Sequence, residues 1–136
     1  MELITKHAVV ALSSNLETFL APDALAALHV LGQKTRLEIF RLLARREPVG
    51  FSAAAIAEMI RTPQNSVSLH LAILTRARLI AVSRRGRSIV YHAKFDGMQA
   101  LILYLLVDCC NGHPGVSARI SAIVENGCGC CESSKA

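Results

Sequence analysis

The sequence has few aromatic residues, few charges and no long hydrophobic run. It contains no tryptophan, and only 18% of its residues are charged. Its longest uninterrupted apolar run is residues 100–107, whereas a membrane-spanning helix needs about 20 apolar residues. The first residues also lack the small-residue cleavage site of a secretory signal. These observations favour a cytoplasmic protein without a membrane partner.

The chain is nevertheless rich in hydrophobic residues for its length. They make up 52% of 136 residues, and a chain of this length has room for one compact domain. This proportion is higher than a single soluble domain needs. We therefore expect part of the apolar surface to meet a second chain.

Positive charge is concentrated in one stretch of the chain. Residues 59–95 contain no Asp or Glu and seven basic side chains, namely Arg61, Arg76, Arg78, Arg84, Arg85, Arg87 and Lys94. The rest of the chain carries eight basic and ten acidic residues. A local positive field of this kind is expected where a protein meets a polyphosphate such as DNA.

The spacing of apolar residues and the positions of Pro and Gly predict a mainly helical chain. The predicted helices cover residues 3–20, 23–32, 34–44, 53–60 and 63–77. Asp23 and Ser52 have the character of N-caps, and we expect Leu37 and Met59 to face the core. The short join before Pro63 predicts a helix-turn-helix.

The helix over residues 63–77 has the features of a DNA-reading helix. Val67, Leu71 and Leu74 share one side, which we expect to pack against the preceding helix. The exposed side is predicted to carry Gln64, Asn65, Ser68, Leu69 and Arg76. Amides and hydroxyls at the start of such a helix suit bases or phosphates in a major groove, and a leucine can contact a thymine methyl.

A β-hairpin with an arginine tip follows this helix. Residues 79–83 and 88–91 are rich in β-branched and apolar side chains, and they flank Arg84, Arg85, Gly86 and Arg87. Gly86 supplies the conformational freedom of a tight turn. We expect these arginines to contact the DNA backbone or minor groove, which adds affinity more than specificity. The predicted fold is a winged helix-turn-helix.

A last helix is predicted over residues 97–110, capped by Asp96 and apolar on every face in its middle. Such a helix needs a partner, so we expect a homodimer formed through the terminal helices. A tail with a weak helical stretch near residues 116–124 follows. The predicted organisation is a dimerisation helix over 1–22, a DNA-binding core over 23–94, a dimerisation helix with a cysteine pair over 95–114, and a flexible tail over 115–136.

Three segments resemble the ArsR/SmtB family of winged-helix metalloregulators. They are GQKTRL at residues 32–37, QNSVSLHL at residues 64–71, and Leu74 with residues 79–80. The resemblance covers residues 23–114 and implies a homodimeric repressor that leaves its operator when an effector binds. By position, it implies DNA contacts from Gln64, Ser66, Ser68, His70 and the wing arginines. For His70, a structural role that holds the hairpin is the alternative.

The five cysteines form two clusters, Cys109 with Cys110, and Cys128 with Cys130 and Cys131. This pattern fits no disulfide framework, and thiolates are soft ligands that select thiophilic ions. Neighbours on a regular helix point about 100° apart, so the first pair can share an ion only if the helix end distorts. Eighteen positions separate Cys110 from Cys128, a reach of up to ~60 Å, so the tail can supply a third sulfur within or between chains.

The resemblance implies a class of effector, and the residues themselves leave several effectors possible. Residues 53–57 lack the cysteines of one arsenic site of the family, and Met98 stands where zinc-sensing relatives need a histidine. The Asp108-Cys109-Cys110 ending resembles arsenic repressors, which implies As(III), with Sb(III) also possible. The alternatives are Hg(II), Cd(II), Pb(II), a methylated arsenical, or a redox or persulfide signal. A thiol enzyme is not favoured, because no glycine-rich cofactor loop or paired carboxylates accompany the cysteines.

Overall fold

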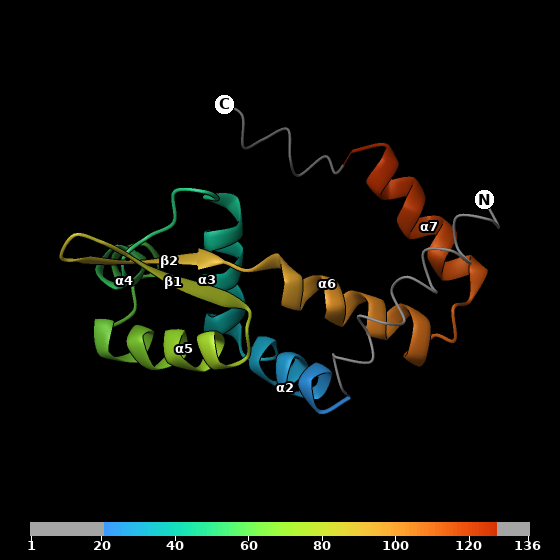
Figure 1. The fold of residues 1–136 in the computed structure, drawn as a ribbon, viewed down its shortest axis with the longest axis horizontal. Helices are drawn as coiled ribbons and strands as arrows, with labels where there is room; N and C mark the ends of the chain where they lie inside the picture. Colours follow the sequence, from blue (N-terminus) through green and yellow to red (C-terminus); the bar gives the residue numbers. More distant parts are fainter. Residues whose placement is uncertain (1–20, 128–136) are drawn as a thin grey trace. The chain divides into compact units, whose positions relative to one another are not determined.

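The computed structural model describes residues 21–127, so the helix predicted over residues 3–20 and the tail cysteines Cys128, Cys130 and Cys131 lie outside the described residues. The elements are α2 (Ala21–Leu31), α3 (Lys34–Arg45), α4 (Ala53–Ile60), α5 (Gln64–Arg76), β1 (Ile80–Arg85), β2 (Ser88–Ala93), α6 (Phe95–Tyr104), the π-helical turn η1 (Leu105–Cys109) and α7 (Pro114–Glu125) (Figure 1). The chain divides into two compact units, Met1–Leu101 and Ile102–Ala136. We describe each by itself.

In the first unit, local polar contacts define where the helices begin. The Gln33 side chain accepts a hydrogen bond from the Arg36 amide at 2.8 Å, and Ser52 accepts one from the Ala55 amide at 3.2 Å. The Ser52 cap predicted from the sequence is therefore confirmed. The Arg36 guanidinium donates from Nε to the Val30 carbonyl at 2.6 Å, which ties the end of α2 to the start of α3.

The core of the first unit lies where α3 meets α2, α4, α5 and β2. Its largest fully buried side chains come from α3, α4, α5 and the start of the hairpin, namely Ile39, Leu43, Ile56, Val67, Leu71, Leu74, Leu79 and Ile80. Each such side chain contributes about 1.5–3 kcal/mol by leaving water. The three α5 residues predicted to pack inward are thus confirmed.

Four predicted details are wrong. Leu37 is 41% exposed and Met59 is 52% exposed, because α3 turns Ile39, Phe40 and Leu43 inward and α4 turns Ile56 and Ala57 inward. Asp23 and Asp96 lie inside the first turns of α2 and α6 rather than at their caps. Both helices begin earlier than their apolar pattern does, so the carboxylates face the positive end of the helix dipole instead.

The hairpin pairs β1 and β2 in antiparallel register from Ile80 opposite Ala93 to Arg85 opposite Ser88. Both strands are longer than predicted, and the turn consists of Gly86 and Arg87 alone. Gly86 has a φ of 64°, a left-handed conformation that glycine adopts without steric cost. The predicted β-hairpin at this place is confirmed.

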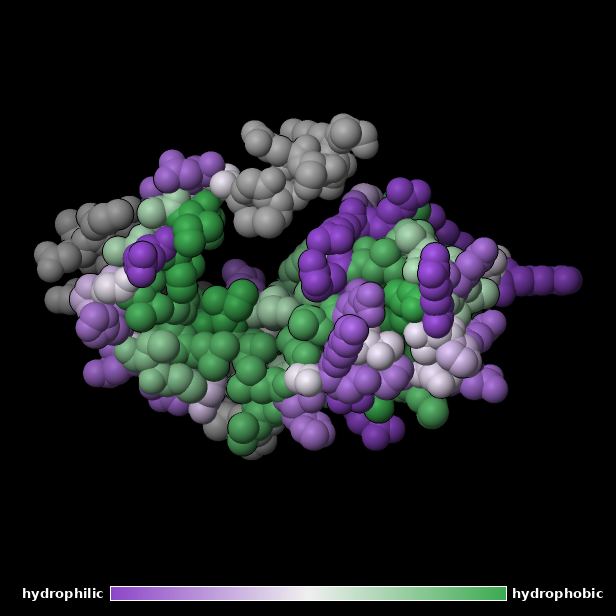
Figure 2. Space-filling view, turned by 180° about the vertical axis from the view of Figure 1, so that it is seen from behind, coloured by the Kyte–Doolittle hydropathy of each residue, from purple (hydrophilic) through white to green (hydrophobic). Residues whose placement is uncertain are grey.

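The second unit comprises the end of α6, η1 and α7. Residues 102–127 include no side chain that is fully buried. Apolar residues are exposed along this stretch, and Figure 2 shows hydrophobic side chains gathered over it. The helical stretch expected near residues 116–124 is α7, which begins with Pro114 after a cap by His113. None of the helices in residues 21–127 has the length and apolar character that crossing a membrane requires.

Candidate nucleic-acid interface and thiol site

A tight turn joins α4 to α5 in the first unit. Arg61 adopts the left-handed conformation with a φ of 54°, and its amide donates to the Ala57 carbonyl. The Thr62 amide also donates to Ala57, at 3.0 Å. These bonds end α4 and reverse the chain within residues 61–63, as expected of a helix-turn-helix.

The structure separates α5 into a buried and an exposed face. Val67, Leu71 and Leu74 are completely buried. Of the α5 residues predicted to contact DNA, Ser66 and His70 are partly buried, and the exposed ones are Gln64, Asn65, Ser68 and Leu69. Leu69 is 68% exposed, so it offers an apolar contact surface beside polar neighbours. This face can form hydrogen bonds and one methyl contact, as base edges in a major groove require.

The N-terminus of α5 has backbone donors available for an anion. Pro63 occupies the N-cap position, and no side chain caps the helix there. The first amides of an α-helix have no intrahelical acceptor, and the helix dipole makes this end positive. A DNA phosphate is an anion that such an end accepts.

His70 lies at the border between the two faces of α5. Its Nδ1 is buried and has no hydrogen-bond partner among the described residues. Burial, followed by the charge of Arg36, lowers the pKa of His70 below the ordinary 6.5. The neutral imidazole is therefore favoured at neutral pH, which supports the structural alternative for this residue over a phosphate contact.

The wing carries its basic residues at the exposed end of the hairpin. Arg84, Arg85 and Arg87 are all exposed, and they lie on both sides of the Gly86 turn. The register places them at the opposite end from Ile80 and Ala93, whose side chains are buried. The base of the hairpin thus joins the core, while its tip presents guanidinium groups that suit phosphates.

Cys109 and Cys110 lie at the end of the π-helical turn η1, and both are exposed. The Cys110 amide donates to the Leu105 carbonyl at 2.9 Å, five residues back, and the Gly112 amide donates to Leu106 at 2.9 Å. The last turn is therefore wider than an α-helical turn. Such π turns occur frequently at functional sites. The end of the helix at the cysteine pair therefore departs from regular α-helical geometry.

The residues around the thiols reverse the chain sharply. Asn111 and Gly112 both have positive φ values, 52° and 61°, and the His113 amide donates to the Cys110 carbonyl at 3.0 Å. A hydrogen bond with Asp108 is the main cause that raises the pKa of Tyr104, and partial burial and the charges of Asp108 and Cys109 add to it. Tyr104 therefore keeps its phenolic proton beside the cysteine pair.

Within residues 21–127 no group of three or more His, Cys, Asp or Glu side chains converges as a metal site. Cys109 and Cys110 are neighbours in sequence at the end of η1, and the other three predicted ligands lie outside the described residues. A site of three sulfurs would need one of those tail cysteines or a second chain.

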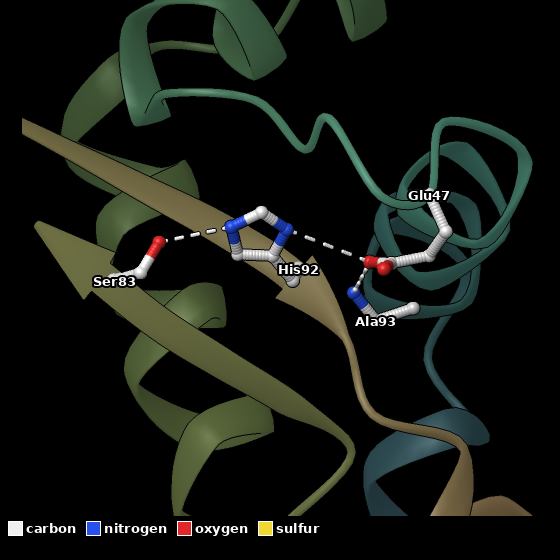
Figure 3. A network of polar contacts seen from close by, with 4 residues as sticks. All are labelled: Glu47, Ser83, His92 and Ala93. Atoms are coloured by element: carbon white, nitrogen blue, oxygen red, sulfur yellow. Dashed lines mark hydrogen bonds and ion pairs between the residues drawn. The ribbon is translucent and has the colours of Figure 1, made fainter. Parts of the chain in front are cut away.

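Two histidines for which the sequence analysis predicts no role have defined partners. His92 lies between Ser83 and Glu47 at the base of the wing (Figure 3). His113 accepts a hydrogen bond from the Gly115 amide at 3.1 Å and so caps α7. For the cap by His113, the sequence signal is a histidine directly before a Pro-Gly helix start. No local signal indicates the contacts of His92.

Comparison with known proteins supports the winged-helix architecture. Residues 31–83 match a helix-turn-helix domain family. The chain is 32% identical over 87 residues to the HTH-type transcriptional regulator KmtR of Mycobacterium tuberculosis, which covers 64% of this chain and 65% of KmtR. The match thus spans slightly less than two thirds of that relative.

Two solved structures share the fold. An ArsR-like transcriptional regulator from Rhodococcus sp. RHA1 superposes with a TM-score of 0.59 at 22% identity, covering 78% of this chain and 93% of that one. A homodimeric winged helix-turn-helix DNA-binding domain from Mycobacterium bovis, a possible ArsR-family regulator, gives 0.54 at 22% identity, covering 72% and 87%. The chain contains a winged helix-turn-helix domain, as its sequence predicts.

Proposed function

We propose that the chain is an ArsR-family transcriptional repressor that binds operator DNA as a homodimer in the cytoplasm and releases it when As(III), or Sb(III), binds cysteine thiolates. The observation that carries the DNA-binding part is the exposed polar N-terminal face of α5, which has uncapped amides at its start. The regulators named above support it by their fold and names. DNA contacts are assigned to Gln64, Asn65, Ser66, Ser68, Leu69, Arg84, Arg85 and Arg87, and His70 is assigned the structural role instead.

The dimer is proposed from unpartnered apolar surface. Ile102 is 44% exposed on α6, and Ile123 and Val124 are 60% and 71% exposed on α7. Exposed apolar residues gathered on one stretch mark sites where another protein surface binds. A second copy of the chain is the natural partner, because the related Mycobacterium bovis domain is homodimeric.

The effector site is proposed at Cys109 and Cys110, with a third sulfur from Cys128, Cys130 or Cys131. Exposed thiols on a widened helical turn can bind an ion without unfolding a regular helix first. Three sulfur ligands suit the soft As(III) ion. Because η1 directly follows the apolar α6, ligation there would change the helix that we assign to the dimer.

The test starts with DNA selected by the protein from a random pool. We expect As(III) to raise the Kd for that DNA at least tenfold in the wild type. Cys109→Ser and Cys110→Ser should abolish the release and leave the DNA affinity within about twofold of wild type. Ser117→Ala, close in sequence and partly buried, is the matched control. Release that is unchanged in both cysteine variants would contradict the proposed site.

A second candidate function is a repressor with the same DNA-binding unit that responds to a different effector. The exposure of both thiols also suits Hg(II), Cd(II), Pb(II), a methylated arsenical, or an oxidant or polysulfide. A titration of the protein–DNA complex with each of these separates the two candidates. Release by peroxide or polysulfide at lower concentrations than As(III) would favour the redox signal.

A further inference from the structure

The turn between α3 and α4 contacts the base of the wing through one carboxylate. Oε1 of Glu47 accepts a hydrogen bond from the Ala93 amide at 2.8 Å and lies 3.7 Å from Nδ1 of His92. The opposite ring nitrogen of His92, Nε2, lies 2.9 Å from the Ser83 hydroxyl (Figure 3). A single side chain outside the hairpin thus contacts β2 directly and reaches β1 through an imidazole.

Backbone contacts at the same place strengthen this connection. The Tyr91 amide donates to the Phe51 carbonyl at 2.8 Å, and the Phe51 amide donates to the Tyr91 carbonyl at 3.1 Å. Gly50 lies between these contacts with a φ of 71°, and a Cβ there would come within 2.4 Å of the Tyr91 carbonyl oxygen and 2.8 Å of the His92 ring. The segment 47–51 therefore contacts three successive residues of β2. We call this set of contacts the wing anchor.

The wing anchor lies far from the residues whose position it sets. His92 pairs with Ala81, whereas Arg84 and Arg85 pair with residues next to the turn. Arg87 lies five positions before His92. At about 3.3 Å per residue the tip is roughly 17 Å from the anchor, so a tilt of about 10° at the anchor moves the tip by about 3 Å. A two-stranded hairpin is not rigid by itself, and its base must be held if the tip is to meet phosphates reproducibly.

The choice of an acidic residue at the base also fits the charge distribution. Residues 59–95 carry seven basic side chains and no acidic ones, so Glu47 supplies negative charge from outside this stretch. Glu47 and His92 are 27% and 17% exposed, and a partly desolvated carboxylate makes a strong hydrogen bond with a backbone amide. Contact at the base leaves the charge of the arginines at the tip free for DNA.

We propose that Glu47 and His92 are positioning residues of the DNA interface, which act by holding the base of the hairpin so that Arg84, Arg85 and Arg87 meet the phosphate backbone. This inference rests on the proposed function as a DNA-binding protein. Neither residue touches DNA itself. Their substitution should therefore loosen the wing in the free protein and weaken DNA binding only through the wing arginines.

The first measurement follows the anchor without DNA. In Glu47→Ala we expect hydrogen exchange at the Ala93 amide to rise at least tenfold over wild type. Glu47→Gln is the matched control, because the amide oxygen can still accept the Ala93 hydrogen bond, and exchange should stay within about threefold. Unchanged exchange in Glu47→Ala would overturn the anchor, whatever the DNA result.

The second measurement is a double-mutant cycle on DNA affinity at several salt concentrations. We expect Glu47→Ala and His92→Leu to raise the Kd about tenfold and to lower the salt slope by up to about 0.9 for each lost phosphate contact. In a background with Arg84→Ala, Arg85→Ala and Arg87→Ala, neither substitution should have a further effect. An equal loss of affinity in both backgrounds would overturn the positioning role.

Two controls keep the outcomes distinct. Far-UV circular dichroism identifies a variant that does not fold, and Glu47→Ser and His92→Gln then carry the same comparison with smaller changes in side-chain volume. If the wild-type protein binds no selected DNA, the proposed function fails, and with it the positioning role. The exchange measurement still decides whether the wing anchor exists.

Discussion

The two units of the chain differ in how they treat their apolar residues. In the first unit, large side chains of α3, α4, α5 and the hairpin base are buried against one another, and the N-terminal part of α5 and the tip of the wing expose polar and basic side chains. In the second, residues 102–127 include no fully buried side chain, and Ile123 and Val124 are mostly exposed. The first unit therefore has a buried core of its own, although it also exposes apolar side chains such as Leu25 and Met59, whereas the described residues of the second unit form no such core.

The largest effect should come from breaking the core of the first unit. Leu71 is completely buried on α5, and Leu71→Ala should lower the free energy of unfolding by about 2–5 kcal/mol through lost burial and a new cavity. Leu69→Ala, two residues away and 68% exposed, is the control and should change it by less than about 0.5 kcal/mol. Urea denaturation measures both. Equal losses would mean that the buried and exposed faces of α5 are wrongly assigned.

A smaller effect, on the dimer dissociation constant, is expected from a substitution in the second unit. Ile123→Glu places a charge in the apolar surface that we assign to the dimer, and should raise the dimer dissociation constant by about tenfold or more, which corresponds to ~1.4 kcal/mol. Ser121→Glu adds the same charge on the other side of α7 and should leave the dimer intact. Sedimentation equilibrium measures both. A dimer unaffected by Ile123→Glu would remove α7 from the interface.

The smallest effect should be a pH dependence of the stability of the first unit. Burial and Arg36 lower the pKa of His70, so as the pH falls through 6.5 the unfolded chain takes up a proton before the folded one does. Stability should thus fall from pH 6.5 down to the folded-state pKa and level off below it. His70→Gln should flatten this part of the Tm profile. Parallel wild-type and variant profiles between pH 7.5 and 5 would argue against this effect.

Local sequence features were sufficient to predict the DNA-binding unit. Val67, Leu71 and Leu74 recur at helical spacing and are buried, Ser52 caps α4, and Gly86 occupies a turn that requires a positive φ. Each feature acts over a few residues, so a pattern in the sequence reflects it directly. The exposed faces followed from the buried ones, because a short helix that buries one side leaves the other to solvent.

Other features depended on contacts that no local pattern encodes. Leu37 and Met59 have apolar side chains at plausible helical positions, yet the way α3 and α4 pack turns them outward. The π turn at Cys109 arises from one extra residue between the Cys110 amide and its acceptor, Leu105. In a helix that is apolar on every face, the spacing of apolar residues cannot indicate where one extra residue widens a turn.

The sequence by itself determined a helix-turn-helix with a basic wing and placed a cysteine pair at the end of the last apolar helix. Only the tertiary structure decided how the wing is held, because Glu47 and Ala93 are 46 positions apart and meet only after α3 and the hairpin have packed. It also decided that both thiols are exposed on a widened turn. The buried face of a helix produces a periodic pattern of apolar residues in the sequence. A hydrogen bond between distant segments produces no such pattern, because it forms only once the fold brings them together.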